Sequence, residues 1–169
     1  MDIEARKFVD AFVGLGSNMD DPVSKVRAGM AALETMPETE LKRCSSLYRS
    51  APIGVENQPD FVNAVCRLST GLSSTALLDR LLAIEAAHGR RRPPGLSGGP
   101  RPLDLDLLLY DEQVCESPRL TLPHPRLHKR AFVLLPMVEI APEVVVPGKG
   151  RVGDLAARCV DQRVERIGA

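Results

Sequence analysis

Several features that define particular protein classes are missing from this chain of 169 residues. It has no tryptophan, and four phenylalanines and two tyrosines are its only aromatic residues. Lys and Arg together number 22, as do Asp and Glu, so the net charge is zero. A neutral chain with few aromatics argues against a nucleic-acid or anionic-membrane binder, whose binding face is basic. No apolar run approaches the roughly 20 residues of a membrane span, and the N-terminus lacks a signal-peptide pattern. We therefore expect a cytoplasmic protein without membrane partners.

The cysteines do not form a recognisable motif. They lack a C-x-x-C pair and are scattered along the chain, at Cys44, Cys66, Cys115 and Cys159. This spacing argues against a zinc site or a disulfide framework and predicts reduced, packed thiols. Repeats, coiled-coil heptads and low-complexity tracts are also absent from the sequence. We expect one domain over residues 1–169, with residues 1–7 as a poorly ordered extension and the chain as a monomer.

The most informative stretch is Gly99–Tyr110, G-P-R-P-L-D-L-D-L-L-L-Y. Its short apolar run, bounded by Pro102 and Asp111, is typical of a strand. Side chains alternate along a strand, so Asp104 and Asp106 share one face while the leucines at 103, 105, 107 and 109 point into a core. Carboxylates roughly 6–7 Å apart repel by about 2–3 kcal/mol at an effective dielectric of about 20. A Mg²⁺ ion, completed by waters and phosphates, would relieve this repulsion. The alternative is a solvated strand face that carries two aspartates.

The segment just before this strand is rich in arginine. Residues 90–101, R-R-R-P-P-G-L-S-G-G-P-R, contain prolines and glycines that exclude a helix and predict a mobile loop. Arginines beside a carboxylate pair favour the handling of a polyphosphate, with a solvated linker as the alternative.

Hydrophobic periodicity predicts the remaining elements. Strands are expected at 8–15, 40–49 and 61–69, and helices at 22–36, 74–87 and 131–140, the last interrupted by Pro136. A small helix is expected at 153–160 before a frayed end. Residues 14–18, G-L-G-S-N, lack the third glycine of a dinucleotide fingerprint and are typical of a strand-to-helix turn. Glu85 lies near a helix C-terminus, where the helix dipole disfavours a negative charge. One interpretation is that this side chain has a function, and the alternative is an ordinary surface glutamate. His124 and His128 have i,i+4 spacing, but Pro125 argues against a zinc-binding helix and favours an anion-contacting or structural role.

Motifs follow one another in order between residues 13 and 147. They are G-L-G-S-N at 14–18, S-L-Y-R-S-A-P-I-G at 46–54, Q-P-D-F-V-N at 58–63, I-E at 84–85, G-R-x-R at 89–92, G-P-R-x-L-D-L-D at 99–106, L-P-H-P-R-L-H-x-R-A-F at 122–132 and E-I-A-P at 139–142. This ordered set resembles the 6-hydroxymethyl-7,8-dihydropterin pyrophosphokinase family. The resemblance implies an α+β fold with a ferredoxin-like core, in which a mixed, largely antiparallel sheet carries helices on both faces.

The resemblance also implies roles for individual residues. Two Mg²⁺ ions would be held by Asp104 and Asp106 and would bridge the phosphates of ATP. The polyphosphate would be clamped by Arg90, Arg92 and Arg101, with Arg90 and Arg101 as catalytic groups. ATP would also contact Glu85, Leu107, Arg119, Thr121, His124 and Arg130. The second substrate, 6-hydroxymethyl-7,8-dihydropterin, would be stacked and hydrogen-bonded by Ser50, Ala51, Ile53, Phe61, Asn63 and Phe132. Its hydroxymethyl oxygen would attack the β-phosphorus of ATP, and AMP would leave.

The sequence departs from the family pattern at three positions. Gly98 stands where a tryptophan often precedes G-P-R, Phe61 where tyrosine is common, and Ala51 where proline is common. Residues 147–150, P-G-K-G, are not a phosphate-binding P-loop, so ATP is held in another way. The residues by themselves, without the resemblance, leave two other functions open. One is another Mg²⁺-dependent transferase such as a D-x-D nucleotide-sugar enzyme, for which the chain is short. The other is a ferredoxin-like anion- or RNA-binding module, which the neutral charge and few aromatics disfavour.

Overall fold

Ten strands and four α-helices make up the part of the chain that the computed structural model describes, residues 7–51, 59–89 and 102–167. The strands are β1 (Val9–Ser17), β2 (Thr39–Cys44), β3 (Tyr48–Ser50), β4 (Phe61–Thr70), β5 (Asp104–Tyr110), β6 (Cys115–Glu116), β7 (Thr121–Leu122), β8 (Val145–Val146), β9 (Gly150–Arg151) and β10 (Val164–Arg166). The helices are α1 (Pro22–Glu34), α2 (Ser74–Ala87), α3 (Ala131–Ile140) and α4 (Val152–Ala157), with a 3₁₀ turn at Leu127–Lys129. The arginine-rich segment 90–101, Ile53 and residues 1–6 of the predicted extension lie outside the described residues.

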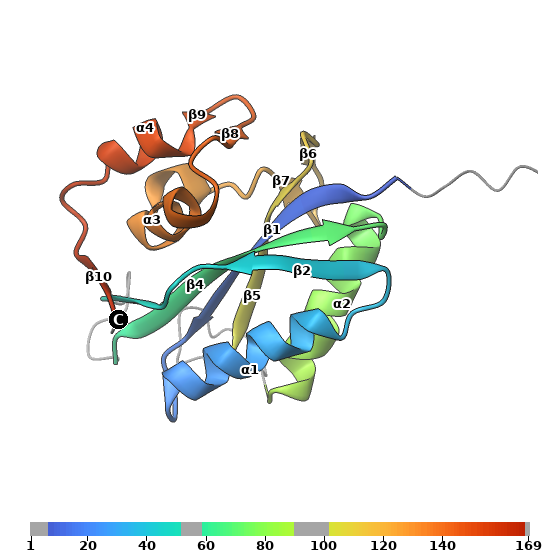
Figure 1. Cartoon of the computed structure of the whole chain (residues 1–169), viewed down its shortest axis with the longest axis horizontal. Helices are drawn as coiled ribbons and strands as arrows, with labels where there is room; N and C mark the ends of the chain where they lie inside the picture. Colours follow the sequence, from blue (N-terminus) through green and yellow to red (C-terminus); the bar gives the residue numbers. More distant parts are fainter. Residues whose placement is uncertain (1–6, 52–58, 90–101, 168–169) are drawn as a thin grey trace, which may run out of the picture.

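A six-stranded sheet organises the fold. Its strand order is β10-β3-β4-β1-β5, and β2 also pairs with β4. All strand pairings within the described ranges are antiparallel. Helices α1 and α2 cover one face of the sheet, while α3 lies on the other with α4 packed against it (Figure 1). The predicted α+β class, with a largely antiparallel sheet and helices on both faces, is confirmed.

The central strand β1 separates two hydrophobic cores. Ala11, Val13 and Leu15 are buried on the face covered by α1 and α2, whereas Phe12 is buried on the face covered by α3. Alternation along the strand explains this division, because successive side chains point to opposite faces. Residues 14–18 were predicted to form a strand-to-helix turn. This prediction is wrong for most of the segment, because β1 continues through Ser17.

The pairing of β1 with β5 contains a bulge that changes one predicted orientation. The register shifts between Phe12 and Val13, so that Phe12 lies opposite Leu109 while Val13 lies opposite Leu107. A slip of one residue moves the following side chains to the other face. Leu109 therefore packs in the core under α3, whereas the sequence had predicted that it shares a face with Leu107.

The predicted strand over residues 40–49 is divided in two by a side-chain contact. Ser45 Oγ accepts a hydrogen bond from the Val65 N–H at 2.9 Å, and the Ser45 N–H donates to the Val65 oxygen at 2.8 Å. The chain thereby leaves the edge of β4 after β2 and returns to it as β3. Residues 164–167 of the tail that was predicted to be frayed are ordered, since β10 pairs with β3 and the Ile167 N–H donates to the Leu47 oxygen.

Two cysteines that were predicted to be reduced are joined in the structure. Cys44 on β2 lies opposite Cys66 on β4, and the two form a disulfide with Cα atoms 4.2 Å apart. They are 22 residues apart in the sequence, so only the pairing of the two strands brings them together. Cys115 and Cys159 are free.

The helices begin and end close to the predicted residues. Asp21 caps α1 by accepting from the Ser24 N–H, and Ser73 caps α2 by accepting from the Ala76 N–H. Helix α3 continues through Pro136 without the predicted interruption. None of the helices in the described ranges is both long enough and apolar enough to span a membrane.

Candidate active site

One row of paired residues crosses four strands on the α3 face of the sheet. Asp104 lies opposite Gly16 on β1, Gly16 opposite Asn63 on β4, and Asn63 opposite Tyr48 on β3. Directly opposed residues in antiparallel strands point to the same face. With neighbouring strands about 4.8 Å apart, the backbones at Asp104 and Asn63 are about 10 Å apart. The row therefore aligns a carboxylate and a buried amide on either side of a glycine.

The two aspartates of β5 share a face, as predicted. Asp106 lies opposite Gly14, so the partner of each aspartate on β1 is a glycine without a side chain. Both carboxylates are half-buried. No group of three His, Cys, Asp or Glu residues in the described ranges could hold a metal by itself. The two carboxylates do fit an ion such as Mg²⁺, which takes one or two carboxylates and completes its shell with waters and substrate phosphates.

Glu85 fixes the strand that carries the aspartates. Its side chain projects from α2 and is only 4% exposed. One carboxylate oxygen accepts a hydrogen bond of 2.7 Å from the backbone N–H of Leu105, which lies between Asp104 and Asp106. This bond explains why an acidic residue occurs near the C-terminal end of α2, where the helix dipole disfavours it.

A cavity of about 370 Å³ opens beside Asp106 and extends along α2. This volume suits a small molecule. The cavity brings together five of the six described residues that the resemblance assigned to ATP, namely Glu85, Leu107, Arg119, Thr121 and His124. Apolar side chains of Leu78, Leu82 and Leu120 complete much of the wall. Arg119 forms an ion pair with Asp79 of α2, which holds its side chain at the rim.

His124 and Arg130 share the electrostatic environment of Asp106. Burial lowers the pKa of His124, and the negative charge of Asp106 partly opposes that shift. Burial likewise lowers the pKa of Arg130, again opposed by Asp106, and the guanidinium stays charged at neutral pH. His124 Nδ1 accepts from the Arg126 N–H at 3.2 Å, so the neutral ring carries its proton on Nε2. His128 does not line the cavity.

A second cluster of predicted site residues lies at the start of β4. Asn63 Nδ2 donates to Ser50 Oγ at 2.7 Å, and both side chains are buried. A Cβ atom at Gly16 would be 3.2 Å from Asn63 Oδ1 and 3.9 Å from the Phe61 ring, so the glycine leaves room on this side of Asn63. Ala51, the next residue after β3, is exposed.

Phe132 belongs to the helix on the same face of the sheet. It lies in the first turn of α3, and the Arg130 guanidinium carbon is 5.4 Å from the centre of its ring. Ile53, Arg90, Arg92 and Arg101 were also predicted to be site residues but lie outside the described ranges.

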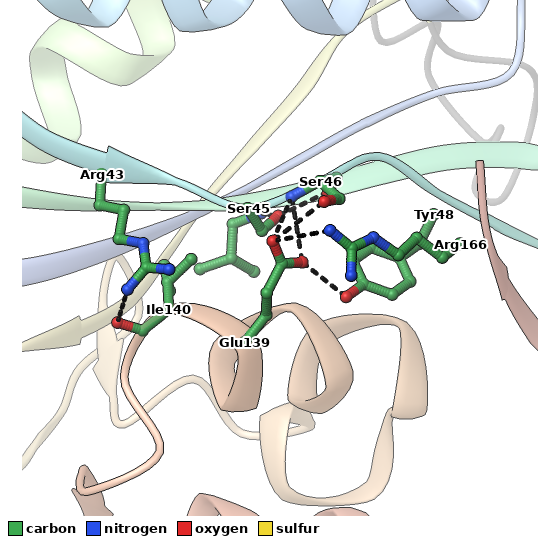
Figure 2. A network of polar contacts seen from close by, with 8 residues as sticks. Arg43, Ser45, Ser46, Tyr48, Glu139, Ile140 and Arg166 are labelled. Carbon is green, nitrogen blue, oxygen red and sulfur yellow. Dashed lines mark hydrogen bonds and ion pairs between the residues drawn. The ribbon is translucent and has the colours of Figure 1, made fainter. Parts of the chain in front are cut away.

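Glu139 anchors α3 to β3, a role that the sequence did not predict (Figure 2). Its carboxylate accepts from the Ser46 N–H at 3.0 Å, from the Ser46 hydroxyl at 2.9 Å and from the Tyr48 hydroxyl at 2.6 Å. Arg166 of β10 adds an ion pair at 3.7 Å. The motif E-I-A-P at 139–142 contained this glutamate, but its hydrogen-bond donors Ser46 and Tyr48 lie 93 and 91 residues away in the sequence.

The network shifts the pKa values of both acidic groups. Burial, and then the hydrogen bond to Glu139, raise the pKa of Tyr48 to about 12. Burial alone would raise the pKa of Glu139, but the bonds from Tyr48 and Ser46 outweigh it and lower the pKa below its usual value. The carboxylate is therefore ionised at neutral pH and ties α3 to the strand that leads to Ser50.

Comparison with known proteins identifies the family. The sequence profile described as 7,8-dihydro-6-hydroxymethylpterin-pyrophosphokinase (HPPK) matches residues 12–142. The chain belongs to this family. It is 44% identical over 156 residues to the Pseudomonas aeruginosa 2-amino-4-hydroxy-6-hydroxymethyldihydropteridine pyrophosphokinase, which covers 92% of this chain and 95% of the relative. It is 39% identical over 159 residues to the Haemophilus influenzae enzyme of the same name, covering 94% and 98% of the two chains.

Solved structures of HPPK proteins share the fold. Plasmodium falciparum HPPK-DHPS, determined with pterin and p-hydroxybenzoate, superimposes with a TM-score of 0.72 at 14% identity. The match covers 94% of this chain and 44% of that longer chain. The predicted ferredoxin-like architecture is confirmed. As a member of the HPPK family, the protein is a pyrophosphokinase, that is, an ATP-dependent diphosphotransferase of folate biosynthesis.

Proposed function

We propose that this HPPK protein transfers the terminal diphosphate of ATP to 6-hydroxymethyl-7,8-dihydropterin in a reaction that requires Mg²⁺. The products are AMP and the pterin diphosphate. The names of the curated relatives support the pterin substrate. The observation that carries the proposal is the row across the sheet, with Asp104 and Asn63 about 10 Å apart on one face and Gly16 between them. A pterin hydrogen-bonded at Asn63 would direct its hydroxymethyl group towards phosphates held above Asp104.

ATP would occupy the cavity beside Asp106. The apolar wall of Leu78, Leu82 and Leu107 suits a nucleoside, and the polar end at His124 and Asp106 suits the phosphates. Two Mg²⁺ ions held by Asp104 and Asp106 would neutralise phosphate charge during transfer.

The cations of the chain would supply the remaining stabilisation. His124 donates its Nε2–H and Arg130 its guanidinium hydrogens towards the charge that builds up on the phosphate oxygens. In a low-dielectric site, donors held in advance stabilise such charge more than mobile water does. Arg90, Arg92 and Arg101, which precede β5 in the sequence, would clamp the polyphosphate.

The pterin would bind between the start of β4 and the start of α3. Phe61 and Phe132 would stack on its two faces, and Asn63 would hydrogen-bond its edge, with Ser50 and backbone near Ala51 and Ile53 completing the contacts. In the reaction the hydroxymethyl oxygen attacks the β-phosphorus of ATP in line, loses its proton and gains the diphosphate, while the bond from that phosphorus to the AMP oxygen breaks. The reaction needs positioning and charge neutralisation but no covalent intermediate.

A product assay tests the proposal directly. The protein is incubated with MgATP and 6-hydroxymethyl-7,8-dihydropterin, and AMP is separated from ADP. AMP formed only in the presence of the pterin, one for one with the pterin diphosphate, supports the proposal. ADP would indicate transfer of a single phosphoryl group, and the absence of both products would refute the substrate assignment. Gel filtration of the active fraction tests the further proposal that the enzyme works as a monomer.

Isosteric variants test the metal-binding role. Asp104→Asn and Asp106→Asn should each lower kcat by at least about 100-fold, because each removes a charged oxygen ligand. Glu112→Gln is the matched control, since it removes an exposed carboxylate just beyond β5. Both aspartate variants should keep the wild-type circular dichroism spectrum. Turnover that does not depend on added Mg²⁺ after treatment with EDTA, or full activity in the double variant, would refute the assignment.

A further inference from the structure

Gln162 in the C-terminal segment holds the backbone on both sides of Arg130. Its Oε1 accepts a hydrogen bond of 2.9 Å from the Ala131 N–H, and its Nε2 donates one of 2.7 Å to the Lys129 oxygen. The two bonds determine the orientation of the amide, because a rotated amide would oppose donor to donor and acceptor to acceptor. A side chain 31 residues beyond Ala131 therefore clamps the backbone of the tripeptide from Lys129 to Ala131.

This clamp supplies what the start of α3 lacks. Arg130 is the N-cap residue of α3 and makes no side-chain capping hydrogen bond. The first N–H groups of a helix have no partner within the helix, and arginine is not among the residues that commonly cap them. Gln162 satisfies the Ala131 N–H from outside the helix, which the Arg130 guanidinium cannot do because it only donates hydrogen bonds. The Arg130 side chain instead lies over the Phe132 ring and interacts electrostatically with Asp106.

The same segment also holds the other side of the site. Directly after Gln162, β10 pairs with β3, with Val164 opposite Ser50 and Arg166 opposite Tyr48. The end of the chain thus contacts both the start of α3, which carries Phe132, and the strand that ends at Ser50. Five residues of chain span from one wall of the site to the other, from Gln162 to Arg166.

We propose that Gln162 is a positioning residue for the diphosphoryl transfer, which acts by fixing the backbone around Arg130 so that Arg130 faces the phosphates and Phe132 faces the pterin. The proposal rests on the proposed function, which supplies the two ligands. Gln162 touches neither ligand, and the clamp contributes through the geometry of the residues that do.

Gln162→Met tests the clamp because methionine keeps the length and flexibility of the side chain but makes neither bond. Gln162→Glu is the conservative variant, since it keeps the acceptor for the Ala131 N–H and loses the donor to the Lys129 oxygen. Ser73→Ala is the matched control, because it removes another helix-capping hydrogen bond, that of the Ala76 N–H, at the far end of α2 from Glu85. Each protein is characterised by its melting temperature, by hydrogen exchange of the Ala131 amide, and by kcat and KM for each substrate.

We expect the Ala131 amide of Gln162→Met to exchange about tenfold faster than in the wild type. We also expect kcat/KM for the pterin to fall by about tenfold or more, through both kcat and KM, since small misplacements of contacting groups slow catalysis strongly. Gln162→Glu should recover part of the protection and of the activity. Ser73→Ala should lower the melting temperature by a similar amount and leave both KM values and the Ala131 exchange unchanged.

Wild-type kcat and KM in folded Gln162→Met would overturn the proposal, whatever its melting temperature. Unchanged exchange at Ala131 would overturn it too, because the clamp would then not hold that amide. A loss of activity in Ser73→Ala equal to that of Gln162→Met would show a general effect of stability and would also refute a positioning role. These results differ from a failure of the proposed function, in which the wild type itself forms no AMP with the pterin.

Discussion

Replacing Tyr48 with phenylalanine should lower the free energy of unfolding by about 2 kcal/mol at neutral pH. The hydroxyl donates at 2.6 Å to the Glu139 carboxylate, Tyr48 is only 7% exposed, and hydrogen bonds to charged groups contribute about 1.5–3 kcal/mol. The Glu139 side chain is 21% exposed and keeps its bonds from Ser46, which holds the loss below the upper end of that range. Glu139→Ala should cost more, about 3–4 kcal/mol, because it leaves the donors of both Ser46 and Tyr48 without their acceptor.

Tyr110→Phe is the matched control. The Tyr110 hydroxyl donates to the backbone oxygen of Leu72, a neutral acceptor, so its loss should cost about 1 kcal/mol. Urea unfolding followed by far-ultraviolet circular dichroism measures all three variants, because the chain has no tryptophan to report by fluorescence. The m-value should stay the same, so that the midpoint alone reports stability.

The difference in the free energy of unfolding between wild type and Tyr48→Phe should also depend on pH. The pKa of Glu139 is lowered in the fold, so its contribution is present above its ordinary value of 4.5 and is lost as the pH falls through the lowered value. The pKa of Tyr48 is raised to about 12, so its contribution is complete below the ordinary value of 10 and is lost as the pH rises through about 12. The difference in the free energy of unfolding should therefore be largest between pH 4.5 and pH 10 and should decline on both sides of this range. A cost no greater than that of Tyr110→Phe, or one that stays unchanged as the pH is lowered well below 4.5, would refute this reasoning.

Three further changes have distinct expected results. Glu85→Ala should lower the free energy of unfolding by about 2–3 kcal/mol and reduce kcat, because it leaves the Leu105 N–H buried without its acceptor. Glu85→Gln should recover both the stability and kcat. A loss of stability with wild-type kcat would contradict the role of Glu85 in positioning β5. Gly16→Ala should raise KM for the pterin by about tenfold, because the new Cβ lies 3.2 Å from Asn63 Oδ1, and an unchanged KM in the AMP assay would count against that site. Cys44→Ser should have a free energy of unfolding about 2–3 kcal/mol lower than that of the oxidised wild type. This difference should disappear when dithiothreitol reduces the wild type. A difference that persists would show that the disulfide is not its source.

Local patterns in the sequence determined the elements and the carboxylate pair. Apolar residues at helical spacing located α1, α2 and α3, and two-residue alternation located β4 and β5 with Asp104 and Asp106 on one face. These features follow from the backbone geometry of single elements, so a short window of sequence contains the information they need. The order of motifs similarly identified the family before any contact was known.

Only the tertiary structure decided which residues meet. The bulge at Phe12 turned Leu109 to the other core, and the pairing of β2 with β4 joined Cys44 to Cys66. The bonds of Glu139 and Gln162 also cross tens of residues and depend on how α3 lies against β3 and the C-terminal segment. Alternation along one strand says nothing of the register with its neighbour, and a polar side chain does not specify its distant partner. The sequence by itself therefore determined the elements, the family and the groups available for chemistry, whereas the packing of α3 on the sheet and the pairing of β10 with β3 decided how those groups are held.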